Sequence, residues 1–250
     1  MGDNPAMKLL AFETSTEACS VALWLDGEVR ERFELAPRRH AELSLPWAEA
    51  LLAEAGIGRS QLDAVALGRG PGAFTGVRLA IAVAQGIALA LDRPLLPVST
   101  LAILALRASV PAGEAPAGEA APHRVYASID ARMGEVYTGA FELRDGEAFA
   151  LDAERVCAPA EAVVPGENGG WLGVGTGFGA AEGALAQRLA PRFAAIDAQA
   201  LPHAADLARL AAAAYARGEA IAPELVEPAY LRDNVALTIA EQAALRNRGG

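Results

Sequence analysis

The first 35 residues carry a pattern of apolar and polar positions that predicts three consecutive strands. An apolar run covers residues 8–13, a weaker alternation covers 19–25, and the pair Asp26-Gly27 separates it from a second alternating segment at 28–35. An Asp-Gly pair between two such segments is a strong signal for a tight hairpin turn. The pattern therefore predicts a three-stranded meander at the start of the chain.

Helical spacing and a crossover follow the meander. Residues 41–55 repeat apolar positions at the helical period, with Pro46 either in the first turn or at a kink. Short apolar runs at 64–67 and 94–98 predict buried strands, and residues 77–91 between them predict a helix. A strand, a helix and a strand in this order predict a crossover between parallel strands.

The second half of the chain repeats this order. Residues 109–122 are rich in proline, glycine, alanine and glutamate without periodicity, which predicts a mobile surface segment. A second meander with its own Asp-Gly pair follows, and then a second crossover whose turn reads GTGFG. The predicted elements cover residues 125–130, 135–141, 147–156, 171–174, 180–189 and 192–196. The repetition predicts a duplicated fold.

This order of elements resembles the ribonuclease-H-like module, which actin-like ATPases, Hsp70 and sugar kinases use twice. The resemblance implies an α/β protein of two actin-like domains, with mixed sheets flanked by helices. We assign residues 1–104 to the first domain, which holds the dimerisation helices, 105–221 to the second, and 222–250 to a C-terminal tail. In that superfamily the two halves face each other across a nucleotide cleft, with an acid at the end of the first strand of each half.

Glu13 and Asp130 occupy those two places. In one interpretation the chain is a small ATPase or kinase whose two acids hold magnesium and orient water; in the other they are ordinary turn residues. Turns that bind phosphate closely need glycine, because side chains keep the backbone amides from converging on the oxygens. The turn at 14–17 has none, and Arg132 and Met133 precede the glycine of the other turn. We expect a vestigial cleft formed by Glu13, Thr14, Ser15, Asp130 and Arg132.

The glycine-rich loop RGPGAFTG, residues 69–76, is expected to make a tight strand-to-helix turn rather than a phosphate cradle. Its spacing, GxGxxxG, departs from the dinucleotide fingerprint. Thr75 is expected to cap the following helix. Small residues recur four apart in that helix and predict a ridge that a second helix can approach closely. The ridge consists of Gly76, Ala80, Ala84 and Ala88.

Apart from Arg78 and Gln85, the helix at 77–91 is apolar. A helix that is apolar nearly all round is buried on more than one side, and a sheet covers only one side. The second cover is either a helix of another subunit or the core of this chain, and the sequence leaves both open. With a partner, Arg78 and Gln85 flank the contact.

Composition excludes several classes of function. Lysine and arginine number 21 against 31 acidic residues, a net charge of −10, so we do not expect the chain to bind nucleic acid unaided. Lys8 is the only lysine, which excludes a GxxxxGK[ST] loop and a Schiff-base lysine. Cys19 and Cys157 form neither a disulfide framework nor a zinc motif, which indicates a reduced, cytoplasmic protein. No segment reaches the roughly 20 apolar residues of a membrane span, so we expect no membrane association.

Four separated motifs resemble those of the TsaB (YeaZ) family, whose members are needed to make threonylcarbamoyladenosine in tRNA. The motifs are FETSTEACSVALWLDG at 12–27, GRGPGAFTGVRLAIAVAQGIALAL at 68–91, IDARMGEVY at 129–137 and EPAYLRDNVA at 227–236. They follow one another in the family's order, and the resemblance covers nearly the whole chain.

The resemblance implies a subunit without catalytic residues and without a cofactor or metal of its own. It implies pairing with the transferase TsaD through the two helices of the first half, and docking of the ATPase TsaE on the pair. Alone, the chain is expected to form a homodimer through the same helices. ATP, ADP and metal are expected on the partner subunits, and tRNA is expected to be reached only through the complex. The metal-binding HxxxH of TsaD is replaced here by STLAI at 99–103.

The candidate interface residues follow from this resemblance and from the small ridge. They are His40, Leu43, Trp47, Leu51, Gly76, Val77, Arg78, Ala80, Ile81, Ala84 and Gln85. In the C-terminal tail, Tyr230 and Arg232 either anchor the tail on the body or face a partner.

A peptidase is the third interpretation, suggested by the family's grouping with glycoproteases. It needs a serine nucleophile paired with a histidine, and no histidine lies in a motif that would supply one. The histidines are instead expected to be surface or capping residues. The serines considered are Ser15, Ser20, Ser44 and Ser99, and the histidines are His40, His123 and His203.

Overall fold

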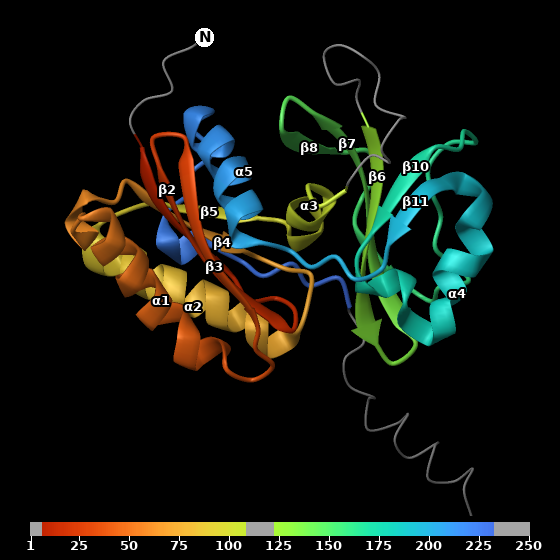
Figure 1. Cartoon of the computed structure of the whole chain (residues 1–250), viewed down its shortest axis with the longest axis horizontal. Helices are drawn as coiled ribbons and strands as arrows, with labels where there is room; N and C mark the ends of the chain where they lie inside the picture. The colour runs from red at the N-terminus through yellow and green to blue at the C-terminus, as the bar shows by residue number, and fades with distance from the viewer. Residues whose placement is uncertain (1–6, 109–122, 233–250) are drawn as a thin grey trace, which may run out of the picture.

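The computed structural model describes residues 7–108 and 123–232, which form two lobes, each built on one mixed sheet (Figure 1). The first sheet has the order β3-β2-β1-β4-β5 and the second β11-β10-β6-β7-β8, with β9 paired to β7. The first sheet contains β1 (Lys8–Glu13), β2 (Ala18–Leu25), β3 (Glu28–Leu35), β4 (Ala64–Gly68) and β5 (Leu95–Val98). The second contains β6 (His123–Arg132), β7 (Glu135–Arg144), β8 (Glu147–Ala150), β9 (Arg155–Cys157), β10 (Trp171–Val174) and β11 (Phe193–Asp197).

The two sheets share one topology. β1 pairs antiparallel with β2 and parallel with β4, so that Phe12 lies between Val21 and Leu67. In the second sheet β6 pairs antiparallel with β7 and parallel with β10, so that Val125 lies between Phe141 and Leu172. The predicted duplicated ribonuclease-H-like fold is therefore confirmed.

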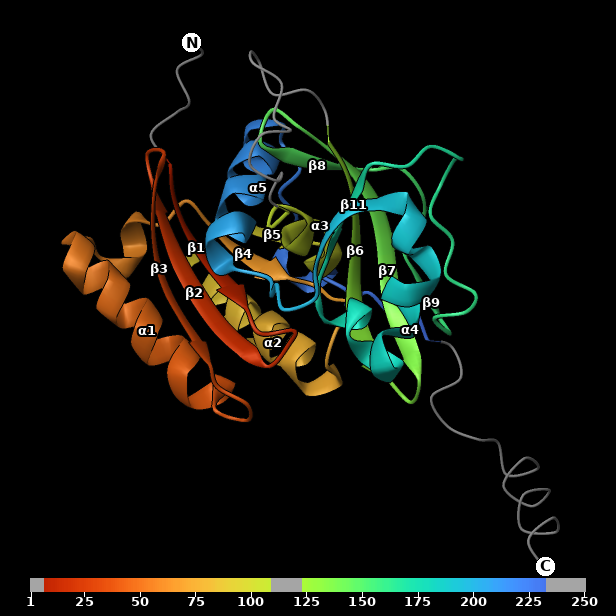
Figure 2. The same ribbon diagram turned by 45° about the vertical axis from the view of Figure 1, so that its right-hand side comes forward.

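Helices cover both sheets on both faces (Figure 2). On the first sheet, α1 (His40–Ala55) and α2 (Phe74–Leu91) pack on one face and α5 (Ala204–Ala216) packs on the other. On the second sheet, α3 (Thr100–Ala105) and α4 (Ala180–Leu189) take the two faces. The division at residues 104 and 221 follows the sheets, whereas α3 and α5 each pack on the sheet of the other half.

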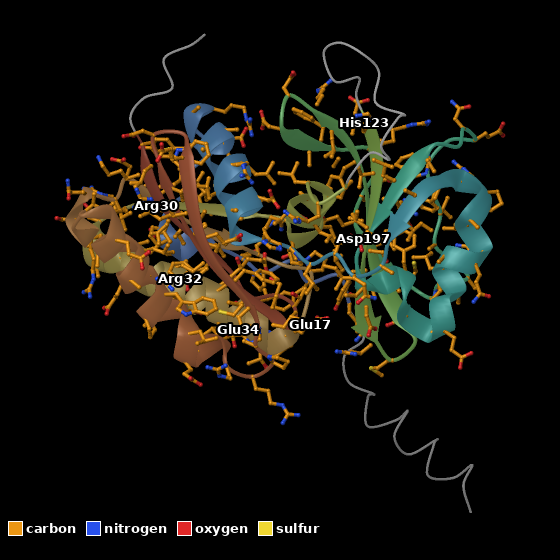
Figure 3. The ribbon with its side chains drawn as sticks, viewed as in Figure 1. Glu17, Arg30, Arg32, Glu34, His123 and Asp197 are labelled. Atoms are coloured by element: carbon orange, nitrogen blue, oxygen red, sulfur yellow. The ribbon has the colours of Figure 1, made fainter. Side chains whose placement is uncertain are left out.

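The edge strand β3 is protected by charged side chains. Figure 3 shows Arg30, Arg32 and Glu34 in succession along it. Arg30 donates a hydrogen bond of 3.1 Å to the carbonyl oxygen of Glu54 in α1, and Arg32 forms an ion pair with the Glu54 carboxylate. Charges along an edge disfavour pairing with a strand of another chain.

Two predictions about individual elements are wrong, and two helices were not predicted. The strand predicted at 147–156 is split into β8 and β9, because the residues from Leu151 to Glu154 leave the ladder. Helix α2 begins at Phe74, so Thr75 lies inside the helix. The cap position is Ala73, whose side chain has no atom that could accept a capping hydrogen bond. The structure also contains α3 and α5, which the sequence analysis did not predict, although Leu207, Leu210 and Ala211 recur in α5 at helical spacing.

The predicted mobile segment at 109–122 and the tail beyond residue 232 lie outside the described residues.

Candidate functional site

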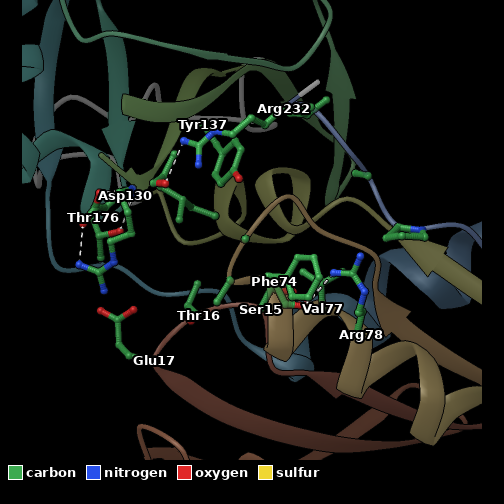
Figure 4. A pocket seen from close by; sticks show the side chains of 18 of the residues that line it. Ser15, Thr16, Glu17, Phe74, Val77, Arg78, Asp130, Tyr137, Thr176 and Arg232 are labelled. Atoms are coloured by element: carbon green, nitrogen blue, oxygen red, sulfur yellow. Dashed lines mark hydrogen bonds and ion pairs between the residues drawn. The ribbon is translucent and has the colours of Figure 1, made fainter. Parts of the chain in front are cut away.

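The two lobes enclose a cleft of about 590 Å³, which is shown in Figure 4. The first lobe contributes the turn after β1, the loop before α1 and the first turn of α2. The second lobe contributes the turn after β6, Tyr137 and Thr176, and residues 228–232 of the C-terminal segment complete the wall. The predicted vestigial cleft residues Ser15, Asp130 and Arg132 line this space, whereas Glu13 and Thr14 do not.

Glu13 points into the first lobe instead of the cleft. It is 1% exposed, and its Oε1 accepts a hydrogen bond of 2.7 Å from the backbone N–H of Ser15. The Thr100 hydroxyl lies 3.4 Å from its Oε2, and a methyl group on Gly68 would lie 1.9 Å from that oxygen. Burial raises the pKa of the Glu13 carboxyl above its ordinary value, against the hydrogen bonds from Ser15 and Thr100, which lower it. The carboxyl is part of the core and does not reach the space that a nucleotide would occupy.

The glycine loop packs directly on the turn after β1, the turn that the sequence analysis considered as a phosphate cradle. A methyl group on Gly72 would lie 2.3 Å from the carbonyl oxygen of Ser15, and one on Gly76 would lie 2.0 Å from that of Thr14. The backbone N–H of Ala73 donates a hydrogen bond of 2.7 Å to the Ser15 carbonyl. These glycines let the loop pack directly against the turn after β1. The loop is therefore a tight packing element, in agreement with the prediction from the sequence.

The second lobe repeats this close approach. Methyl groups on Gly175 and Gly177 would lie 2.2 Å from the carbonyl oxygen and 2.0 Å from the Oγ of Ser128 in β6. Between the two glycines, Thr176 accepts a hydrogen bond of 3.2 Å from the backbone N–H of Asp130. Both lobes thus use their glycine-rich turn to brace the first strand of the sheet.

Asp130 faces the cleft but is already paired. Its carboxylate accepts hydrogen bonds from the backbone N–H of Arg132 at 2.8 Å and from the Arg132 guanidinium at 2.9 Å. The Asp130 side chain is 28% exposed. A metal ion at this carboxylate would have to displace the arginine.

The C-terminal segment anchors on both lobes. Ile221 exchanges two backbone hydrogen bonds with Leu95, and Gln85 of α2 donates a hydrogen bond of 2.8 Å to the carbonyl of Pro223. Farther along, Tyr230 bonds Arg78 of α2. Of the two roles considered for Tyr230, the structure shows the anchoring contact.

Arg232 makes the contact with the second lobe. Its guanidinium forms an ion pair with Glu135 and donates a hydrogen bond of 3.1 Å to the carbonyl of Ala131. Residues 221–232 therefore span the two lobes, and Arg78 and Gln85 face this segment.

The small ridge of α2 faces the core of its own chain, and the prediction that it is open to another helix is wrong. Gly76, Ala80, Ala84 and Ala88 are buried against the first sheet, as are Val77 and Ile81. The reason is the approach seen at Gly76, which brings α2 close to the sheet.

The opposite face of α2 carries the exposed apolar residues that the sequence analysis missed. Leu89 is 64% exposed, and Ala82, Gly86 and Ala90 are exposed at a spacing of four residues. A methyl group on Gly86 would meet no atom within 4 Å. The spacing was readable from the sequence, but two small ridges lie on this helix and only packing shows which one is outside.

Among the described residues, α2 is also the one helix long and apolar enough to cross a membrane by length and composition alone. The core helices of soluble proteins pass the same test. Here 33% of the helix is buried, all of it on the face that lies against the sheet. The expectation that α2 is covered on more than one side is met only in part, by the segment at Pro223.

The candidates on α1 also lie mostly inside. Leu51 is 2% and Leu43 9% exposed, and Trp47 packs against both core clusters of that face. His40 lines the cleft, and its Nε2 donates to the carbonyl oxygens of Thr16 at 3.0 Å and Ala18 at 3.2 Å. This histidine holds the turn after β1.

No serine hydroxyl bonds a histidine ring within residues 7–108 and 123–232. Ser15 bonds Thr100, Ser20 bonds Glu31, Ser44 bonds the backbone of His40, and Ser99 bonds Glu154. His203 pairs with Glu31 and stacks on Phe33 at 4.0 Å. The same part of the chain shows no group of three or more histidine, cysteine or acidic side chains that could hold a metal ion.

Comparison with known proteins gives the family. The Escherichia coli K12 protein named tRNA threonylcarbamoyladenosine biosynthesis protein TsaB is 41% identical over 240 residues, which cover 92% of this chain and 96% of that protein. The chain belongs to the TsaB family. The Haemophilus influenzae protein of the same name is 39% identical over 92% of this chain and 95% of its own length. A family model described as TsaD: tRNA N6-adenosine threonylcarbamoyltransferase matches residues 34–240.

Solved structures agree with this family assignment. The solved structure described as YeaZ from Pseudomonas aeruginosa is 49% identical in sequence. The match covers 90% of this TsaB-family chain and 100% of that chain, with a TM-score of 0.80. A second Pseudomonas aeruginosa structure, described as an uncharacterized protein with similarity to peptidase YeaZ, gives a TM-score of 0.81 at the same identity. The predicted family and the predicted fold are both confirmed.

Proposed function

We propose that this TsaB-family chain is a non-catalytic scaffold subunit in the synthesis of threonylcarbamoyladenosine in tRNA. It pairs with TsaD through the outer face of α2 and holds TsaD in an active conformation. The family supports the pathway, since the relatives from Escherichia coli and Haemophilus influenzae carry that biosynthetic name. The observation that carries the pairing is the exposed apolar face of α2.

That face is unlike a solvent-facing helix surface. Leu79, Ala82, Gly86 and Leu89 follow one another along it without a charged residue, in a chain whose net charge is −10. A helix beside solvent normally turns charged residues outward. An exposed apolar stripe on such a chain favours contact with another protein.

Gly86 gives the same indication by a different route. A glycine in the middle of a helix is about 1 kcal/mol less favourable than alanine. Nothing among the described residues requires glycine here, because none of their atoms lies within 4 Å of the place that a methyl group would take. With Ala82 and Ala90 it forms a row of small exposed residues, which would allow a partner helix to approach at the near end of the usual spacing of about 8 to 10 Å.

The same face serves a homodimer when the chain is alone, so homodimer and heterodimer exclude each other. We expect either contact to bury about 1,600 Å² in total. ATP, ADP and metal bind the partner subunits, and TsaE docks on the pair. The tRNA is contacted through the complex, because a chain with net charge −10 leaves phosphate contacts mainly to its partners. The two free cysteines are consistent with a cytoplasmic setting.

The test uses Gly86→Glu, which adds a charge to the outer face without a clash inside the chain. Co-elution with TsaD from the same organism is expected to be lost, and the isolated variant is expected to be monomeric by light scattering. Val163→Glu is the control, because Val163 is 66% exposed and lies on the second lobe. Retained co-elution of Gly86→Glu, with the control also retained, contradicts the interface. The candidate interface residue Ile81 is unsuitable for this test, since it is 8% exposed and a charge there would destabilise the packing of α2 on the sheet.

An ATPase or kinase remains the alternative, since the cleft is of nucleotide size and Asp130 lines it. The inward orientation of Glu13 and the pairing of Asp130 with Arg132 count against it. Calorimetry with ATP and magnesium separates the two, because binding that Asp130→Asn abolishes, accompanied by turnover, would support the enzyme.

A further inference from the structure

We propose that the cleft between the lobes binds a nucleoside monophosphate through Arg38 and Arg78, without a metal ion and without hydrolysis. This inference does not depend on pairing with TsaD. It starts from the charge of the cleft, which is opposite to that of the chain. Four arginines line the cleft against two acids, Glu17 and Asp130, although acids outnumber basic residues by 31 to 21 in the sequence. The arginines are Arg38, Arg78, Arg132 and Arg232.

Two of the four charges are neutralised. Arg132 pairs with Asp130 and Arg232 pairs with Glu135. Arg38 and Arg78 form no ion pair with any residue that the structure describes. Of the acids in the cleft, Glu17 lies on the side of Asp130, away from Arg78 (Figure 4). The Arg78 side of the cleft is therefore positively charged.

Arg78 is held in place by neutral groups. Its guanidinium carbon lies 3.3 Å from the centre of the Phe74 ring, and it bonds the Phe74 carbonyl and the Tyr230 hydroxyl. A guanidinium fixed by aromatic groups keeps its charge and its remaining N–H groups for an anion. Because it is already ordered, binding a phosphate costs little side-chain entropy.

Flat groups surround the same charge. Phe74 and Tyr230 are 64% and 61% exposed at the rim, and the Tyr137 hydroxyl points into the cleft without a hydrogen bond to any described residue (Figure 4). Exposed aromatic rings stack on nucleic-acid bases. A volume of about 590 Å³ lies in the range of small-ligand sites. A ligand that joins a phosphate to an aromatic base can place the phosphate against the arginines and stack the base on the aromatic rings.

The geometry favours one phosphate over three. The glycine turns pack tightly against the ends of β1 and β6, with Gly72 against Ser15 and Gly177 against Ser128, which leaves no room for phosphates at these two places. Additional phosphates would extend toward Glu17 and Asp130, where like charges repel them. AMP should therefore bind at least as tightly as ATP.

The test is isothermal titration of the full chain with AMP, adenosine, inorganic phosphate and ATP, each with EDTA present. AMP is expected to bind, adenosine to bind at least tenfold more weakly, and the affinity for AMP to fall with added salt. Arg78→Gln and Arg38→Gln are each expected to weaken AMP about tenfold. Arg59→Gln, a surface arginine paired with Glu49, is the charge-matched control and should leave AMP binding unchanged.

Two further variants separate the roles. Tyr230→Phe removes the bond to Arg78 and keeps the guanidinium, so AMP binding should persist within about threefold. Asp130→Asn removes a negative charge and releases Arg132, so AMP binding should be retained or become tighter, whereas an ATPase site would lose its ligand. Absence of AMP binding at millimolar concentration overturns the proposal, as does equal binding of adenosine and AMP or equal binding by the Arg78→Gln variant. None of these results bears on pairing with TsaD, which Gly86→Glu tests separately.

Discussion

A methyl group on Gly76 would lie 2.0 Å from the carbonyl oxygen of Thr14. The Thr14 hydroxyl in turn donates a hydrogen bond of 2.7 Å to the Gly76 carbonyl. The first turn of α2 and the end of β1 are thus in direct backbone contact. This contact sets which face of α2 is buried, and it leaves no room for a phosphate chain between the two elements.

Substitution by alanine is expected to have opposite effects on the free energy of unfolding at Gly76 and at Gly86, although both lie in α2. Gly76→Ala places a methyl group against the Thr14 carbonyl and should lower the free energy of unfolding by about 1 to 3 kcal/mol. Gly86→Ala meets open space and should raise it by up to about 1 kcal/mol. Urea denaturation of both variants measures the difference. Equal effects at the two positions would show that the close approach is not rigid.

The buried carboxyl of Glu13 is expected to lower the free energy of unfolding as the pH rises. Burial raises its pKa in the folded state above the ordinary value of 4.5, so the folded state binds the proton more tightly than the unfolded state. Its contribution to the free energy of unfolding is complete below that ordinary value and decreases as the pH rises through the folded pKa. Glu13→Gln keeps an acceptor for the Ser15 N–H and should flatten this decrease.

The measurement is urea denaturation of wild type and Glu13→Gln from about pH 4 to about pH 8. The variant should match or exceed the wild type at neutral pH, and Glu13→Ala should lose about 2 kcal/mol or more because it leaves a cavity. A Glu13→Gln variant that is much less stable than the wild type at neutral pH would disprove the protonation argument.

The contribution of Glu31 to the free energy of unfolding is expected to depend on pH in the opposite direction. Burial raises its pKa, but hydrogen bonds from His203, Ser20 and the Ala205 N–H outweigh burial and hold the pKa below its ordinary value. The stability that Glu31 contributes is present above the ordinary value of 4.5 and is lost as the pH falls through the folded pKa. Through these bonds the carboxylate holds the first turn of α5.

Glu31→Gln should therefore lose about 1 to 2 kcal/mol at neutral pH, with a smaller difference from the wild type in acid. Thermal unfolding at several pH values measures the change. Glu28→Gln, at an exposed position of the same strand, is the control and should change little. A constant difference between Glu31→Gln and the wild type at all pH values would contradict the charge-dependent role.

The contacts of Asp206 are expected to stabilise the packing of α3 against α5. Its carboxylate is 6% exposed and bonds Arg107, after α3, at 3.2 Å and Arg209 at 2.7 Å. Asp206→Asn should cost about 2 kcal/mol, because the amide cannot satisfy two guanidinium groups. Urea denaturation tests this, with Asp197→Asn at an exposed position of β11 as the control. An equal effect of both substitutions would rule out a special role for the Asp206 contacts.

The strands were predictable because their signals are local. The Asp-Gly pairs, the alternation around them and the apolar runs at 8–13 and 64–67 follow from neighbouring residues alone, and β1, β3 and β4 lie within one residue of the prediction. The duplication was readable from the order of these signals. The long helix α2 was predicted as well, although its start moved three residues toward the N-terminus.

The orientation of side chains was not predictable in the same way. Glu13 and Asp130 occupy equivalent places in their sheets, yet Glu13 lies beside Gly68 in the core and Asp130 faces the cleft. The roles of Tyr230 and Arg232 depend on contacts with Arg78 and Glu135, which lie about 100 residues or more away in the chain.

The sequence by itself determined most of the strands and helices, their duplicated order, the family and the apolar character of α2, because these depend on spacing along the chain. Only the tertiary structure decided which small ridge of α2 is buried, which acid is withdrawn from the cleft and where its positive charge gathers. Those outcomes depend on the distance between segments far apart in sequence. At Gly76, for example, the end of β1 is so near that a methyl group would lie 2.0 Å from the Thr14 carbonyl oxygen.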